Sequence, residues 1–218
     1  RYTLDNLAHS LKTPLAAMRA LLNDRHSEGF GDRFNEQIDR MDEIVRYQLR
    51  KPAASVADNL VLAPVHVEKE VARLVDGLRK VYHDKSPEFD VRVEKGLQFR
   101  GDTGDFLELA GNLLDNACKW CERSVRISIV PSVGARAIAS GMVLTVSDDG
   151  PGIPPEAADA LLQRGMRLDE ATPGHGIGLA VVKDIAHSYG GRLSIQTSDL
   201  GGAEFTVSIP PVSTAKSD

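Results

Sequence analysis

The chain has 218 residues, of which 42% are hydrophobic, so it is long enough to bury a core in one domain or in two small ones. Lys and Arg number 26 against 31 Asp and Glu, and the net charge of −5 argues against a general nucleic-acid-binding protein, because no basic excess is available to neutralise phosphates. We find no signal peptide and no apolar run of the roughly 18 residues that a membrane span needs. Because the sequence begins inside a helical pattern, we expect a fragment of a longer protein, with any membrane segment upstream.

The first predicted element is an amphipathic helix at the N-terminal end. His9 lies off its apolar stripe, and Asp5 and Thr13, four residues before and after, share the face of His9. Pro14 cannot donate a backbone hydrogen bond and is expected to kink the helix locally. Taken alone, this pattern favours an exposed histidine on a helix surface. The apolar residues recur every three or four positions: Leu4, Leu7, Leu11, Leu15, Met18 and Leu22.

A second amphipathic helix is predicted after a turn at residues 29–31. Two helices alone bury too little apolar surface to be stable, so the hairpin of residues 1–51 is predicted to pair with a second copy as a four-helix homodimer. The alternative is that the hairpin packs on the following domain, and the mass in solution distinguishes the two. Residues 52–58 form a predicted linker. The apolar residues of the second helix are Phe34, Ile38, Met41, Val45 and Leu49.

Residues 59–218 form the second predicted domain, in which helices and strands are mixed. Asp102 is a candidate N-cap for the longest helix, and residues 199–202 join the last two strands as a hairpin turn. The Gly- and Pro-rich segment 150–176 has no sustained period and is predicted to be a long functional loop. Because strands and helices do not alternate strictly, an α+β fold with a two-layer α/β sandwich fits better than a doubly wound sheet. The predicted helices are about 67–81, 103–120 and 177–189, and the predicted strands are 89–93, 125–129, 142–146, 192–197 and 204–209.

The two cysteines are spaced as Cys-x-x-Cys. Zinc would need two more ligands at matching spacing, which the neighbouring sequence lacks, and a redox pair normally opens a helix, whereas Cys118 and Cys121 end one. We therefore predict reduced thiols.

Polar residues interrupt the longest predicted helix on one face. Asn112, Asn116 and Lys119 fall at i, i+4 and i+7, and Glu108 lies one turn earlier. Amide and carboxylate oxygens suit a Mg2+ ion that is shared with phosphates, and the lysine adds a positive charge. A solvated helix face is the alternative, but it explains poorly why two amides interrupt an apolar stretch.

Two further segments complete the candidate site. Asp148 follows a strand, where its carboxylate can accept a hydrogen bond from an exocyclic amine, and Gly150 and Gly152 allow close approach. An isolated D-x-G-x-G of this kind is usually a plain turn. Before the last helix, backbone N–H groups around three glycines can form an anion-binding nest. They match neither G-x-G-x-x-G nor G-x-x-x-x-G-K-[ST], so a nucleotide site here is of another kind. These glycines are Gly174, Gly176 and Gly178.

The chemistry-bearing segments occur in the order H-S-L-K-T-P at 9–14, N-L-L-D-N-A-C-K at 112–119, D-D-G-P-G-I-P at 148–154 and G-H-G-I-G-L at 174–179. In order and spacing, and over essentially the whole chain, they resemble the sensor histidine kinases of two-component signalling. The first two, with L-G-G-A at 200–203, look most like the PhoQ-type kinases. The resemblance implies that the second domain is an ATP-binding domain of the gyrase, chaperone and histidine kinase type.

The resemblance also implies a role for each residue of these segments. His9 matches the phosphoacceptor and Asp148 the carboxylate that reads the adenine amine, with Gly150 and Gly152 shaping the pocket floor. Asn116 matches the Mg2+-binding asparagine, with Asn112 alongside and Lys119 near the phosphates. The helix spacing, not the resemblance, adds Glu108 to Asn112 and Asn116 as a predicted metal ligand. Gly174, Gly176 and Gly178 match the lid glycines beside the triphosphate, and Arg167 matches a lid arginine that stabilises phosphoryl charge.

The sequence departs from the family pattern at two places. Most members carry Glu or Asp directly after the histidine as a presumed base, whereas Ser10 stands here, as in PhoQ-type kinases. A neutral imidazole is nevertheless a competent nucleophile near pH 7, and Asp5 can orient or deprotonate it. In the lid, Thr172 and His175 replace Arg and Gln, which predicts weaker nucleotide binding or a looser lid.

The sequence thus predicts a homodimeric kinase that uses Mg2+ and ATP to phosphorylate His9 and passes the phosphoryl group to a response regulator receiver domain. Thr13 is expected to position water for dephosphorylating that partner. The resemblance implies a cytoplasmic location and an inner-membrane sensor, with membrane attachment only through an upstream segment. Two alternatives are an ATP-driven clamp ATPase of the same superfamily, which needs no histidine beside Lys-Thr-Pro, and a non-catalytic dimerisation scaffold.

Overall fold

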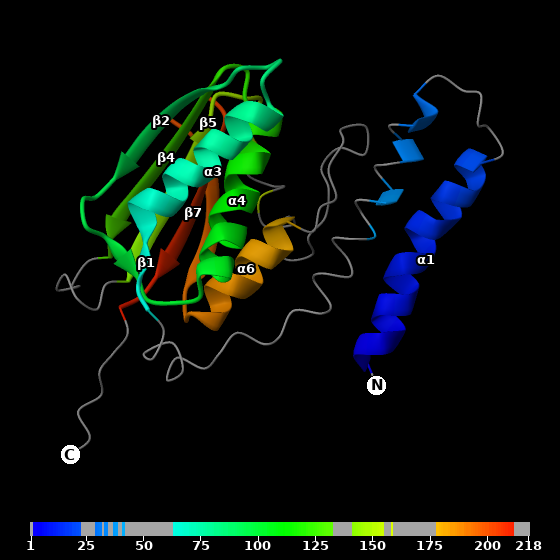
Figure 1. Ribbon diagram of the computed structural model, residues 1–218, viewed down its shortest axis with the longest axis horizontal. Coiled ribbons are helices and arrows are strands. Elements are labelled where there is room, and N and C mark those ends of the chain that lie inside the picture. The colour runs from blue at the N-terminus through cyan, green and yellow to red at the C-terminus, as the bar shows by residue number, and fades with distance from the viewer. Residues whose placement is uncertain are drawn as a thin grey trace. The chain divides into compact units, whose positions relative to one another are not determined.

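The computed structural model describes residues 2–22, 29–31, 33–34, 37–38, 41, 63–132, 141–154, 158 and 178–211. These residues divide between two compact units. The first unit contains helix α1, and the second contains all other labelled helices and strands (Figure 1). The predicted linker 52–58 and residues 59–62, the start of the second predicted domain, lie outside the described residues.

Helix α1 spans Tyr2–Leu22 and continues through Pro14, so the first predicted helix is confirmed. Gly29 makes a turn with a φ of 75°. Phe30 and Gly31, which were assigned to that turn, are instead helical, and the rings of Phe30 and Phe34 stack with centroids 5.5 Å apart. Residues 33, 34, 37, 38 and 41 are also helical, but the rest of the predicted second helix lies outside the described residues.

The second unit is built on a five-stranded mixed sheet with the strand order β2-β4-β5-β7-β6. Only β2 and β4 run parallel, and the other neighbours are antiparallel. Ile127, Val146 and Phe205 lie opposite one another in register on β4, β5 and β7, all three buried. The strands are β2 (Glu88–Val93), β4 (Ser124–Pro131), β5 (Met142–Asp148), β6 (Arg192–Thr197) and β7 (Ala203–Ile209).

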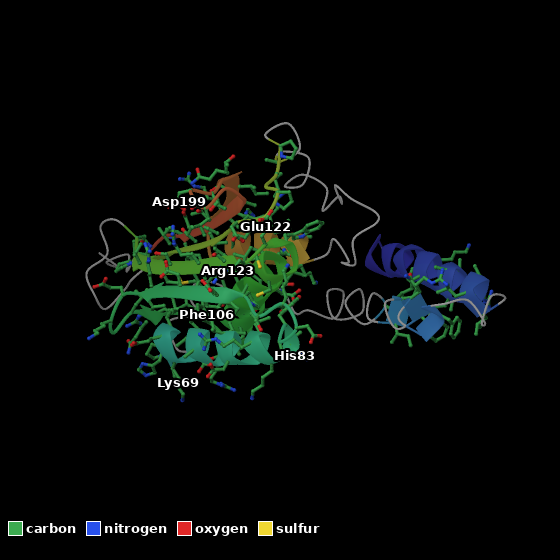
Figure 2. The ribbon with its side chains drawn as sticks, turned by 90° about the horizontal axis from the view of Figure 1, so that it is seen from above. Lys69, His83, Phe106, Glu122, Arg123 and Asp199 are labelled. Atoms are coloured by element: carbon green, nitrogen blue, oxygen red, sulfur yellow. The ribbon has the colours of Figure 1, made fainter. Side chains whose placement is uncertain are left out.

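Three helices cover one face of this sheet and complete the two-layer sandwich (Figure 1). They are α3 (Val67–Val81), α4 (Thr103–Trp120) and α6 (Gly178–Ser188), as the apolar periodicity predicts. Burial alternates along β4, which turns Ile127 and Ile129 towards the helices and Arg126 towards the other face. On that outer face the Arg126 guanidinium pairs with Asp199 of the β6–β7 turn at 2.8 Å, and Asp199 is labelled in Figure 2.

Side chains fix the N-terminal end of α4 and the C-terminal end of α6. The Asp102 carboxylate caps α4 by accepting the Asp105 N–H at 3.1 Å, which confirms the predicted cap. The Tyr189 hydroxyl, just after α6, accepts from the Asp102 N–H at 3.0 Å and donates to the Asp105 carboxylate at 2.8 Å. The C-terminal end of α6 is thereby anchored to the first turn of α4.

The strands differ from the predicted ones in two places. A second, two-stranded sheet pairs β1 (Val65–His66) with β3 (Gln98–Phe99), and two residues per strand show no period that a sequence can reveal. Strand β5 is longer than predicted, so Asp148 is its last residue and not the start of the loop that follows.

Of the predicted loop 150–176, only residues 150–154 and 158 are described. Among the described helices, none combines the length and the hydropathy that a membrane crossing requires.

Candidate functional site

The polar face of α4 carries the first group of predicted site residues. Glu108, Asn112, Asn116 and Lys119 are half-buried, whereas the other face of the helix forms the core. The Asn112 side chain donates from Nδ2 to the Glu108 backbone carbonyl at 2.7 Å. Its amide oxygen Oδ1 is therefore the end that remains to accept a hydrogen bond or to bind a cation.

The start of α6 rests directly on this face of α4. A Cβ atom at Gly178 would lie 2.7 Å from Asn112 Oδ1, so no larger residue fits there without displacing the amide. The structure thus brings the last glycine of the predicted lid motif against the first asparagine of the α4 motif, although 66 positions separate them in the chain.

Asp148 ends β5 as a buried carboxylate with only 2% of its surface exposed. Its Oδ1 accepts the backbone N–H groups of Gly150 at 2.9 Å and Ala203 at 3.2 Å. No hydrogen bond from the described residues reaches Oδ2. Burial raises the pKa of Asp148 above the ordinary carboxyl value, and the two N–H donors oppose this rise.

Glycines make this close packing possible. A Cβ atom at Gly202 would overlap the Asp148 carboxylate, and one at Gly150 would overlap the carbonyl oxygen of Trp120. Gly152 has a φ of 74°, a conformation that side-chain-bearing residues rarely adopt. The predicted glycines therefore leave room for close packing around Asp148 and allow the backbone to turn beside it. Gly202, in the β6–β7 turn, contributes to this packing in the same way.

Asp149, unlike Asp148, binds the backbone of the segment that follows α4. Its Oδ1 accepts the backbone N–H groups of Glu122 at 2.9 Å, Arg123 at 3.0 Å and Ser124 at 2.9 Å. Glu122 and Arg123 are labelled in Figure 2. Burial acts to raise the pKa of Asp149, but the three donors outweigh it and hold the pKa below its ordinary value. We call this arrangement the Asp149 clasp.

Lys119 is engaged within the protein. Its ammonium lies 2.6 Å from Asp115 Oδ2, and the Tyr82 hydroxyl donates to Asp115 Oδ1 at 2.7 Å. Burial, followed by the hydrogen bond to Asp115, raises the pKa of Tyr82 well above its ordinary value, so the phenol remains a donor. Any anion that binds Lys119 must therefore compete with Asp115.

The two thiols lie at the end of the same helix and are free and buried, with 0% and 3% of the Cys118 and Cys121 surfaces exposed. Burial raises the pKa of Cys118 to about 12, which makes its thiolate scarce at neutral pH.

The remaining predicted site residues are not brought into this group by the described structure. Asp5, His9, Ser10 and Thr13 lie on α1, in the other unit, and their side chains fall outside what the structure describes. Arg167, Gly174 and Gly176, like Thr172 and His175, also lie outside the described residues.

Sequence reasoning missed several residues that build the site. Asp149 was visible only as the second member of an Asp-Asp doublet, Gly202 was assigned to a hairpin turn, and Ala203 appeared only as the last residue of the L-G-G-A motif. Tyr82 gave no signal, because its contact with Asp115 spans 33 positions in the chain. Only the folded sheet brings these residues to Asp148 and Lys119.

Comparisons with known proteins agree with this geometry. Residues 101–213 match the family model described as "Histidine kinase-, DNA gyrase B-, and HSP90-like ATPase". The chain is 39% identical over 214 residues to the sensor protein kinase CarS of Pseudomonas aeruginosa, covering 96% of this chain and 46% of CarS. It is 42% identical over 220 residues to the two-component sensor PhoQ of the same organism, covering 95% of this chain and 46% of that protein. The chain thus spans less than half the length of these relatives.

The fold is also found in a solved structure. The mycobacterial sensor histidine kinase MprB superposes with a TM-score of 0.57 at 28% identity, over 69% of this chain and 98% of that one. The matched family, the identities over nearly the whole chain and the shared architecture lead to one assignment. The chain belongs to the histidine kinase-, DNA gyrase B- and HSP90-like ATPase family, and it has the catalytic region of a PhoQ-type sensor histidine kinase.

Proposed function

We propose that this chain binds Mg2+ and ATP in its second unit and transfers the γ-phosphoryl group to His9. The observation that carries the proposal is Asp148, a buried carboxylate with one oxygen held by Gly150 and Ala203 and the other left to a ligand. In this role Oδ2 accepts a hydrogen bond from the adenine amine. An apolar residue, not a carboxylate, would be expected here if the site were only structural.

The polar face of α4 fits the phosphates of the same nucleotide. The oxygens of Asn112, Asn116 and Glu108 would hold the Mg2+ ion. The Asn112 side chain donates to the Glu108 carbonyl through its nitrogen, so its oxygen is the atom that remains for the cation. Among the described residues, no three His, Cys, Asp or Glu side chains gather as metal ligands, so the cation would depend on these amides and on the phosphates themselves. When bound, Mg2+ supplies charge neutralisation for the phosphates.

His9 is the proposed acceptor on α1. A ring nitrogen of the neutral imidazole attacks the γ-phosphorus, the bond to the bridging oxygen breaks, and ADP leaves. Asp5, one turn earlier, orients the ring and takes its proton, since Ser10 replaces the usual neighbouring carboxylate. Arg167 stabilises charge on the transferred group, and Gly174, Gly176 and Gly178 approach the phosphates with their backbone.

The phosphohistidine then donates its phosphoryl group to an aspartate of a response regulator receiver domain, and Thr13 positions water for the reverse dephosphorylation. We also propose that residues 1–51 form a helical hairpin that dimerises, residues 52–58 a linker, and residues 59–218 the ATP-binding domain. In this proposal the chain is the cytoplasmic part of an inner-membrane sensor protein. Named sensor kinases among the relatives support these partners.

The test is incubation of the chain with γ-labelled ATP and Mg2+. We expect label that is labile in acid and stable in alkali, lost in His9→Ala and in Asn116→Ala, with ATP affinity lost only in the second variant. Label that persists in His9→Ala would overturn the assignment of the acceptor. Phosphotransfer profiling against candidate receiver domains would then identify the partner.

A further inference from the structure

The adjacent residues Asp148 and Asp149, at the end of β5, bind different parts of the chain. Asp148 faces the site described above, whereas Asp149 turns away and receives three backbone N–H groups on one oxygen, at 2.9 to 3.0 Å. A carboxylate that accepts several N–H bonds is a strong, charge-assisted tether. The residues that it holds, 122–124, come directly after Cys121, the C-terminal cap of α4.

The Asp149 clasp therefore joins two parts of the site that are 25 to 27 positions apart in the chain. On one side lies Asp148, which is covalently next to the clasp. On the other lies the last turn of α4, which carries Lys119, with Asn116 one turn earlier. The two sides are already so close that a Cβ atom at Gly150 would overlap the carbonyl oxygen of Trp120. A shift of the α4 end would change the separation between the Asp148 carboxylate and the Lys119 ammonium.

We propose that Asp149 is a positioning residue for the nucleotide: it sets the separation between the carboxylate that binds the base and the helix that binds the phosphates. This inference rests on the proposed function, because it needs a ligand that spans both sides. Asp149 itself touches no ligand. Its effect should be large only for a nucleotide held at both ends, because misplacing one end costs nothing when that end makes no contact.

The test is a double-mutant cycle on Mg·ATP affinity, measured by titration calorimetry on the whole chain. Asp149→Ala is expected to weaken binding at least tenfold when Lys119 is present. In a Lys119→Ala background the same change should weaken binding by a clearly smaller factor, because that background has already lost one of the contacts at the phosphate end. Asp149→Asn keeps one acceptor oxygen and should restore part of the affinity, and it replaces the alanine variant if that variant does not fold.

The matched control is Asp102→Ala, which removes the cap at the opposite end of α4 and destabilises the same helix without touching the clasp. It should lower the unfolding midpoint but leave ATP affinity within twofold of the wild type. Unchanged affinity in Asp149→Ala, or an equal loss in both Lys119 backgrounds, would overturn the positioning role. Failure of the wild-type chain to bind Mg·ATP would instead reject the proposed function itself.

Discussion

At the scale of single residues, Asp148 and Asp149 have opposite effects on stability. The pKa of Asp149 is lowered in the folded chain, so its contribution to stability is present at neutral pH and is lost as the pH falls through that lowered pKa. The pKa of Asp148 is raised, so the folded state is favoured below the ordinary carboxyl pKa of about 4, and this advantage is lost as the pH rises through the raised value. An ionised Asp148 is therefore retained at a cost in stability, which is common where a residue serves ligand binding.

This contrast yields a prediction for Asp148→Asn. The amide keeps an oxygen for the N–H groups of Gly150 and Ala203 and carries no charge to bury, so the unfolding midpoint at pH 7 should be unchanged or higher. Its NH2 group cannot accept from an adenine amine, so ATP affinity should fall at least tenfold, about 1.4 kcal/mol or more. Thermal denaturation at pH 7 and pH 4 with ATP titration measures both, and any gain should shrink at the lower pH. A lower midpoint at pH 7 would contradict this account of Asp148.

At the scale of elements, the turn after α3 controls the end of α4. Tyr82 donates to Asp115, Asp115 pairs with Lys119, and the Lys85 ammonium donates to the α4 carbonyls of Cys118 and Lys119 at 2.9 and 2.8 Å. A lysine held by Asp115 is positioned but also partly neutralised. If Lys119 binds the phosphates of a nucleotide, as proposed, they would have to replace Asp115 as its partner.

Competition for Lys119 predicts opposite effects for two conservative variants. Asp115→Asn keeps an oxygen for Tyr82 but releases the lysine, so ATP affinity should rise about two- to fivefold, the range expected for a partly exposed ion pair. Tyr82→Phe removes the donor from Asp115, which then holds the lysine more strongly, so affinity should fall by a similar factor. Titrations at low and high salt should show the gain in Asp115→Asn shrinking as salt screens the charges. Weaker binding in Asp115→Asn would show that Asp115 mainly supports the site.

The elements also show which features a single sequence reveals. Helices α3, α4 and α6 and the five strands of the main sheet have a sustained apolar period, and each was predicted within a few residues. The α4 amides and Asp148 could be proposed as site residues because residue type and local spacing already indicate their chemistry. The Ala203 N–H reaches Asp148 across 55 positions, and the Asp149 clasp across 25 to 27, so no local spacing encodes either contact.

At the scale of the whole molecule, helix α1 leaves part of its apolar stripe exposed. In a single copy, Leu15 and Leu22 of the α1 apolar stripe remain 41% and 44% exposed. Because these side chains are already more than half buried, covering the rest contributes roughly 1 kcal/mol each, and a symmetric dimer makes each contact twice. We therefore expect the chain to have the mass of a dimer in solution, whereas a monomer would support the alternative in which the hairpin packs on the following domain.

The pair of changes Leu15→Asp and Leu22→Asp tests this expectation, because charged side chains cannot be buried at a dimer core without a large cost. The variant should be monomeric by light scattering. Its ATP affinity should remain within about twofold of the wild type, because every described residue of the candidate nucleotide site belongs to the second unit. Val81→Asp places the same charge on a side chain that is 70% exposed in that unit, and it should leave the dimer intact. If the double variant keeps the dimer mass, the α1 stripe is not the interface; if it loses ATP affinity, nucleotide binding depends on the hairpin as well as on the site around Asp148.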